Sequence, residues 1–126
     1  MTVHPQTTET ALTYHRAWTS GDMDAAMACV ADDVTFDTPA GRLEGAEALR
    51  AFMEPFARGL TSSHVLGLHS TDDEAMLMYD TATVLVPSAP AAEWYRISEQ
   101  RIRAGHIIFD RLPFALARGT VTPQQT

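Results

Sequence analysis

The hydrophobic period of the sequence changes at Gly59, and this change restricts the possible folds more than any other feature. Before Gly59, apolar side chains recur at every third or fourth position, as they do on one face of a helix. After Gly59 they alternate with polar side chains, as they do in a strand with one buried face. Helices followed by consecutive antiparallel strands predict an α+β fold, with the helices packed on one face of a sheet.

Three helices and five strands are predicted from this pattern. The helices are Thr8 to Ser20, a second one capped by Asp22, and Ala46 to Leu60. A short strand, Val34 to Thr38, precedes the third helix. The other predicted strands are Ser63 to Ser70, Glu74 to Val86, Glu93 to Arg103 and His106 to Phe114. We expect one folded domain over residues 8–117, with flexible termini at 1–7 and 118–126.

Composition narrows the classes of partner. A chain of 126 residues with 45% hydrophobic residues can bury one core, and its net charge of −7 argues against nucleic acid and anionic membranes as partners. The sequence has no run of about 18 uncharged apolar residues and no signal-peptide pattern at its start, which predicts a cytoplasmic protein. All nine basic residues are arginine, which excludes Schiff-base chemistry by a lysine.

Several motifs carry a resemblance to a known superfamily. They are Ser20-Gly21-Asp22-Met23-Asp24, Ala31 to Phe36, Gly45 to Arg50 and Gly105 to Ile108, and together they extend over nearly all of the predicted domain. In these motifs the chain resembles the nuclear-transport-factor-two-like superfamily, within it the SnoaL-like and ketosteroid-isomerase-like branch. The resemblance implies a cone-shaped fold, in which three helices pack on a curved, mostly antiparallel sheet around an internal cavity. It leaves the reaction open, because the superfamily contains isomerases, cyclases, epoxide hydrolases and non-catalytic domains.

The resemblance also implies site residues. The tyrosine that donates a hydrogen bond to the substrate oxygen in the isomerases corresponds to Tyr14, and the protonated acid near the last hairpin corresponds to Glu99. The position of the isomerase base is occupied by Thr38, which cannot act as a carboxylate base. A steroid-type isomerase is therefore not expected.

A second carboxylate is predicted from strand pairing. If Ala104-Gly105 is a two-residue turn, Glu99 lies directly opposite Asp110 on the neighbouring strand. Two facing acids inside a cavity would share a proton, and either of them could be the base. Arg101 could instead hold both acids ionised, so its role stays open, as does that of His15.

The cavity wall is predicted from the inward period of each element. We expect Tyr14, Glu99 and Asp110 to be catalytic and the following residues to bind substrate: Trp18, Phe36, Thr38, Phe52, Phe56, Tyr79, Ile97, Arg101, Leu112 and Phe114. On the opposite sheet face we expect Trp94, Ile102, Ile107 and Phe109, which predicts a homodimer that buries at least about 1,000 Å².

Three functions remain open at this point. The first is a cofactor-independent acid–base enzyme, of the isomerase or cyclase type, acting on a small apolar carbonyl-containing molecule. The second is an epoxide hydrolase of the limonene epoxide hydrolase type, because Glu99, Arg101 and Asp110 supply an acid–arginine–acid set. The third is a non-catalytic domain that binds a small molecule. No metal or cofactor is expected, since the histidines lack ligand spacing and no nucleotide-binding motif is present.

Overall fold

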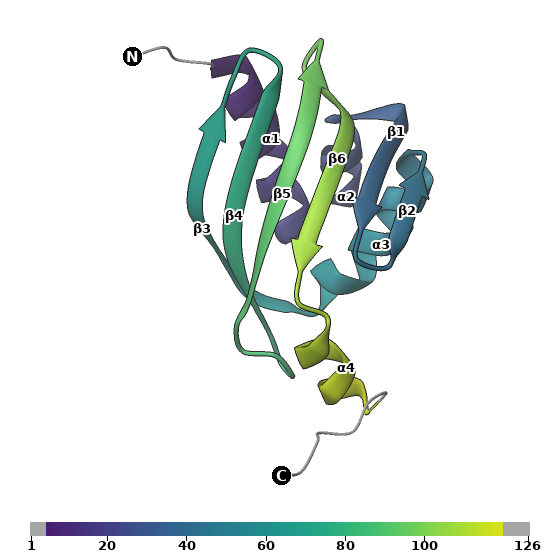
Figure 1. The fold of residues 1–126 in the computed structure, drawn as a ribbon, viewed down its shortest axis with the longest axis vertical. Helices are drawn as coiled ribbons and strands as arrows, with labels where there is room; N and C mark the ends of the chain where they lie inside the picture. The colour runs from purple at the N-terminus through teal and green to yellow at the C-terminus, as the bar shows by residue number, and fades with distance from the viewer. Residues whose placement is uncertain (1–4, 120–126) are drawn as a thin grey trace.

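The computed structural model describes residues 5–119, and these form a six-stranded sheet with helices on one face (Figure 1). The strand order is β2-β1-β6-β5-β4-β3, and every neighbouring pair is antiparallel except β1 and β6. Helices α1, α2 and α3 lie behind the sheet in Figure 1, and α4 lies beyond its lower end. The predicted α+β fold with a curved, mostly antiparallel sheet is confirmed.

The helices begin and end close to the predicted residues. Helix α1 spans Pro5–Thr19, so it starts ahead of the predicted Thr8 and includes part of the segment predicted to be flexible. Helix α2 spans Met23–Met27, and the Asp22 side chain accepts a hydrogen bond from the Ala25 amide, as an N-cap does. Helix α3 spans Ala46–Arg58. At the other end, Arg118 and Gly119, which were also predicted to be flexible, form the end of the last helix. The other predicted flexible residues, 1–4 and 120–126, lie outside the described residues.

The first two strands connect α2 to α3. Strand β1 spans Val30–Thr38, longer than the predicted strand, and β2 spans Gly41–Glu44. Strand β2 was not predicted. It pairs with β1 through a tight turn in which the Thr38 hydroxyl donates a hydrogen bond to the Gly41 carbonyl.

The remaining strands form an antiparallel meander. Strand β3 spans Leu60–Ser70, β4 spans Glu74–Thr83, β5 spans Ala89–Ser98 and β6 spans Arg101–Phe109. Alternate residues of β4 and β5 are buried against the helices, which confirms the strand period expected after Gly59.

The turn of the last hairpin lies elsewhere than predicted. Strands β5 and β6 are joined by Glu99 and Gln100, both with positive φ, at 52° and 60°. Two consecutive left-handed residues form the turn that suits a two-residue hairpin, but glycine and asparagine are its usual residues. Ala104-Gly105 lies inside β6 instead, where Gly105 pairs with Tyr95. The predicted register, and with it the pairing of Glu99 with Asp110, is wrong.

The last strand also ends earlier than predicted. Strand β6 ends at Phe109, and helix α4 spans Leu112–Arg118. The Asp110 side chain accepts a hydrogen bond from the Leu112 amide, and Pro113 occupies the first turn of the helix. Leu112 and Phe114 are therefore helical residues.

The new register changes which residues face the helices. Ile102 and Ile107 belong to the core, and Phe109 is partly buried against it, so their predicted place on the outer sheet face is wrong. The outer face instead carries two cross-strand rows, listed from β4 to β6: Met76, Trp94 and His106, then Met78, Ala92 and Ile108. No helix among residues 5–119 is long and apolar enough to cross a membrane.

Candidate functional site

A buried carboxylate lies at the centre of the inner sheet face. Glu93 is on β5, between Leu77 of β4 and Ile107 of β6, and only 1% of its surface is exposed. Its two carboxylate oxygens accept hydrogen bonds from two tyrosines. The Tyr79 hydroxyl donates to Oε2 at 2.5 Å, and the Tyr95 hydroxyl donates to Oε1 at 2.8 Å. We call Glu93, Tyr79 and Tyr95 the carboxylate cluster.

Burial controls the protonation of this cluster. It raises the pKa of Glu93 from 4.5 to about 7, because the ionised carboxylate loses its hydration, while the two tyrosine hydrogen bonds act in the opposite direction. The pKa values of Tyr79 and Tyr95 are raised well above 10.0, first by burial and then by the negative charge of Glu93. Near pH 7, Glu93 is thus present in both protonation states and the tyrosines are neutral.

Helix α1 covers the cluster with a row of polar aromatic side chains. The Tyr14 ring packs edge-on against Tyr95 at 5.6 Å, and His15 packs against Tyr79 at 4.6 Å between ring centroids. Trp18 contacts both His15 and Tyr79. The Tyr14 hydroxyl, His15 Nδ1 and Trp18 Nε1 are buried without a hydrogen-bond partner among the described residues. Unpaired buried polar atoms are costly, and they frequently mark functional sites.

The charge state of His15 follows from its surroundings. Burial, and then the neighbouring Arg16, lowers the pKa of His15 from 6.5 to about 4. Its Nε2 atom lies 3.3 Å from the Ser63 hydroxyl. His15 is therefore a neutral group at pH 7, at the edge of the cluster.

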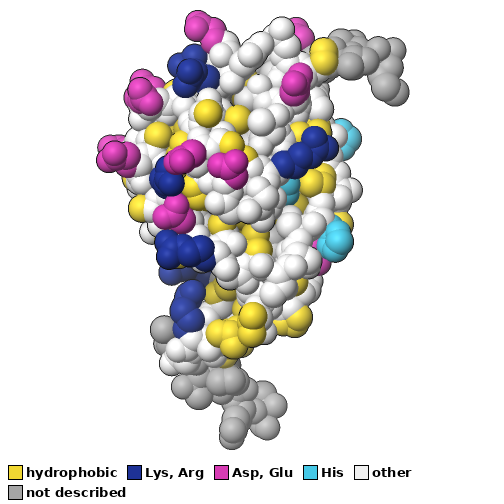
Figure 2. All heavy atoms as spheres, turned by 180° about the vertical axis from the view of Figure 1, so that it is seen from behind, with side chains coloured by type: hydrophobic (Ala, Val, Ile, Leu, Met, Phe, Trp, Pro, Cys, Tyr) yellow, Lys and Arg dark blue, Asp and Glu magenta, His cyan; other side chains and the backbone are white. Residues whose placement is uncertain are grey.

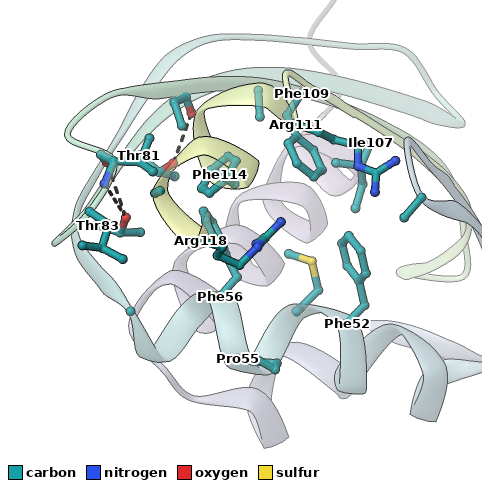
Figure 3. Close-up of a pocket in the computed structure, with 18 of the residues that line it drawn as sticks. Phe52, Pro55, Phe56, Thr81, Thr83, Ile107, Phe109, Arg111, Phe114 and Arg118 are labelled. Atoms are coloured by element: carbon teal, nitrogen blue, oxygen red, sulfur yellow. Dashed lines mark hydrogen bonds between the residues drawn. The ribbon is translucent and has the colours of Figure 1, made fainter. Parts of the chain in front are cut away.

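A cavity of about 540 Å³ opens beside the cluster. Its wall is formed by α3, the lower ends of β4, β5 and β6, the β4–β5 loop and α4 (Figure 3). The side chains that line it are mainly apolar, and they include Phe52, Met53, Phe56, Ile107 and Phe109. Tyr79 lines the cavity and also bonds Glu93, so it connects the two features. A volume of this size suits a small organic molecule.

Helix α4 borders the opening of this cavity. The Phe114 ring packs edge-on against Phe56 at 5.7 Å and against Phe109 at 5.8 Å. Figure 3 shows Phe114 between Phe109 and Phe56, with the side chain of Arg118 extended towards the space between Phe56 and Phe52. The segment predicted as the end of a strand thus forms one side of the opening.

The structure separates the two predicted acids from the cavity. Glu99 lies in the β5–β6 turn with its side chain 89% exposed, 3.9 Å from Arg103. Asp110 is exposed and bonds the first turn of α4. Arg101 is exposed beside the turn. These three side chains do not meet, because the register on which their meeting depended is different.

The predicted substrate-binding residues fall into three groups. Phe52, Phe56, Tyr79 and Phe114 line the cavity. Trp18, Phe36 and Ile97 are buried in the core and are absent from the cavity wall, as is Tyr14. Thr38 bonds within the β1–β2 turn, and Leu112 is exposed on α4, so neither lines the cavity.

Glu93 was missed in the sequence, although a signal for it exists. Ile97 was expected to face inwards, and strand alternation places Tyr95 and Glu93, two and four positions earlier, on the same face. The sequence could therefore have placed the Glu93 side chain on the inner face of the sheet. Within residues 5–119, no group of three or more His, Cys, Asp or Glu side chains is placed to hold a metal ion.

Comparison with known proteins agrees with the fold. Residues 11–108 match the family model of the SnoaL-like domain, so the chain belongs to the SnoaL-like family. A crystal structure from Kribbella flavida is 52% identical, with a TM-score of 0.89 over 92% of this chain and 96% of that one. No match was found among curated proteins.

More distant structures share the fold alone. A nuclear-transport-factor-two-like protein of unknown function from Cytophaga hutchinsonii is 23% identical, with a TM-score of 0.76 over 90% of this chain and 98% of that one. A candidate SnoaL-like polyketide cyclase from Shewanella denitrificans is 16% identical, with a TM-score of 0.72 over 93% of this chain and 99% of that one.

Proposed function

We propose that this protein is a cofactor-independent acid–base enzyme that moves a proton in a small apolar carbonyl-containing molecule, as isomerases and cyclases do. One observation carries the proposal: the buried Glu93, with a pKa of about 7, is bonded to a tyrosine that also lines the cavity. A carboxyl group with a pKa near neutral pH can give and take a proton with nearly equal ease.

Tyr79 is the group through which Glu93 reaches a bound molecule. When Glu93 is protonated, it donates its proton to the Tyr79 oxygen while the Tyr79 hydroxyl gives its own proton to the substrate oxygen. Glu93 becomes a carboxylate, Tyr79 remains neutral and the substrate oxygen gains one proton, while a solvent water in the open cavity accepts the α-carbon proton, so that the ketone becomes its enol. The reverse transfer restores the enzyme. This relay fits the raised pKa of Tyr79, which opposes a lasting tyrosinate.

The test is proton exchange on a simple ketone. We expect the protein to accelerate the exchange of the α-protons of 2-tetralone with D₂O, measured by NMR at pH 7. Glu93→Gln and Tyr79→Phe should each lose most of this acceleration, because either change breaks the relay. Glu9→Gln, the same substitution at an exposed glutamate of α1, is the matched control. Equal rates in the wild type, Glu93→Gln and plain buffer would contradict the proposal.

A second candidate function is ligand binding without turnover. It is favoured by the enclosure of Glu93, since both of its oxygens already accept a hydrogen bond and its carboxylate is not part of the cavity wall. In that case, 2-tetralone would shift the amide signals of cavity residues such as Phe52 and Phe56 without accelerated exchange. The epoxide hydrolase alternative lacks support, because Glu93 has no arginine among its described partners and Arg101 is exposed.

We also propose that two copies pair through the outer sheet face. The rows across β4, β5 and β6 include three apolar side chains that are at least half exposed, namely Met76, Met78 and Ile108. Contiguous exposed apolar side chains on a sheet are typical of an interface. A twofold arrangement would let each face cover the same face of its partner.

A further inference from the structure

Two arginine side chains stand at the opening of the cavity. Arg111 immediately precedes α4 and Arg118 lies in its last turn, and both line the cavity together with Phe114. Their spacing of seven residues is close to two helical turns, and Phe114 falls between them on the same side of the helix. Figure 3 shows both arginine side chains on the cavity side of α4.

These two guanidinium groups lack an acidic partner among residues 5–119. Arg111 donates to the Pro39 carbonyl at 3.4 Å and forms no ion pair there, and neither does Arg118. The remaining sequence, residues 1–4 and 120–126, contains no aspartate or glutamate.

Several other arginines of the protein pair with acidic side chains. Arg42 pairs with Asp37, and Arg50 and Arg58 share Glu54. Figure 2 shows that basic and acidic side chains lie together over much of the helix side of the molecule.

The rest of the cavity offers few hydrogen-bond donors. The Thr81 and Thr83 hydroxyls already donate to the carbonyls of Ala89 and Val86. The wall near Phe52, Phe56 and Phe109 is apolar and would oppose the entry of a charged group. A bound molecule would therefore place its apolar part inside and any anionic group at the opening.

We infer that the cavity binds a small amphipathic carboxylic acid, whose apolar body lies between α3 and the sheet and whose carboxylate lies between Arg111 and Arg118. A planar guanidinium matches a carboxylate with two parallel hydrogen bonds. The inference rests on the same cavity as the proposed function and names the substrate class: a carboxylic acid that also carries the reacting carbonyl. It requires no proton transfer by Glu93.

The experiment compares two ligands of the same shape. The binding of 2-naphthylacetate and of the neutral 2-naphthylacetamide is measured by isothermal titration calorimetry at pH 7 and low salt. The wild type should bind the acid at least about tenfold more tightly than the amide. Arg111→Gln and Arg118→Gln should each reduce this ratio several-fold while leaving amide binding nearly unchanged.

The control is Arg16→Gln, which removes one charge from an exposed position of α1 outside the cavity. This variant should keep the wild-type ratio of acid affinity to amide affinity. Circular dichroism establishes that each variant is folded. Equal affinities for the acid and the amide in the wild type, failure of the acid to bind, or an unchanged ratio in both cavity variants would overturn the inference. A preserved acid preference in a protein that exchanges no ketone protons would instead contradict only the proposed function.

Discussion

Gly105 of β6 lies against the ring of Phe36 of β1, so closely that a Cβ atom built on Gly105 would be 2.4 Å from Cε2 and Cζ of the ring. The two residues are paired in the parallel ladder between β1 and β6. Phe36 is fully buried and contacts Tyr95, which belongs to the carboxylate cluster. The glycine thus makes room for the ring that supports the cluster from one side.

We expect Gly105→Ala to destabilise the protein by roughly 1–3 kcal/mol, the usual cost of forcing extra volume into a packed core. The free energy of unfolding is measured by urea denaturation. Gly67→Ala is the matched control, because a Cβ atom at Gly67 meets nothing within 4 Å. Phe36→Leu should recover part of the loss when it is combined with Gly105→Ala, and independent effects of the two substitutions would contradict the contact.

The buried Glu93 should make stability depend on pH. The pKa of Glu93 is 4.5 in the unfolded chain and about 7 in the folded protein. Between pH 4.5 and pH 7, the folded state therefore holds a proton that the unfolded state has released. The folded state is therefore favoured by acid, and this contribution is lost as the pH rises from 4.5 to 7. The full change is about 3 kcal/mol.

Glu93→Gln isolates this contribution. The difference in unfolding free energy, wild type minus variant, should increase by about 3 kcal/mol as the pH is lowered from 7 to 4.5. Contributions from other titrating groups cancel in the difference, provided that they are unchanged by the substitution. Chemical denaturation at half-unit pH steps gives the curve. A difference that stays constant over this range would show that Glu93 titrates alike in the folded and unfolded protein.

His15 should have the opposite effect in a similar range. The pKa of His15 is about 4 in the folded protein and 6.5 in the unfolded chain. Between these pH values, His15 stays neutral in the folded protein while the unfolded chain takes up a proton. Its contribution to stability is present above pH 6.5 and is lost as the pH falls to 4. The imidazole Cε1 proton, followed by NMR, should therefore shift with a midpoint near 4. A midpoint near 6.5 would contradict the burial of this ring.

Tyr95 should hold down the pKa of Glu93. Its hydroxyl donates to Oε1 of Glu93, and a hydrogen bond to a carboxylate favours the ionised form. Tyr95→Phe should therefore raise the pKa of Glu93 above about 7. The shift is measured from the ¹³Cδ signal of Glu93, with Tyr14→Phe as the control, since the Tyr14 hydroxyl has no hydrogen-bond partner among the described residues. An equal pKa in the wild type and Tyr95→Phe would contradict this role.

The fold was predictable from periodicity because burial on one face imposes a repeat on every strand and helix. The register of the last hairpin was not, because Glu99 and Gln100 adopt positive φ without glycine or asparagine to indicate it. Gly105 indicated a turn, yet its cause is the Phe36 ring, a contact from a distant part of the chain. Pro113 did indicate that the last strand ends early, since proline interrupts strand pairing.

The candidate site was predicted in part. Phe52, Phe56, Tyr79 and Phe114 line the cavity, and for the first three the element and its inward face were both right. Phe114 reaches the cavity from a helix rather than a strand. Glu93 required the correct inward period of β5 and a reason to prefer a buried acid over an exposed one. That reason, two tyrosines converging on one carboxylate, exists only once the strands are paired.

The last prediction concerns assembly. If two copies pair through the outer sheet face, a charge at its centre should separate them, because a buried charge without a partner is costly. Ile108→Glu places one on the row that also holds Met78 and Ala92. We expect a dimer for the wild type and a monomer for Ile108→Glu by light scattering at micromolar concentration. Leu116→Glu, at an exposed position of α4, should remain a dimer. A monomeric wild type would contradict the proposed interface.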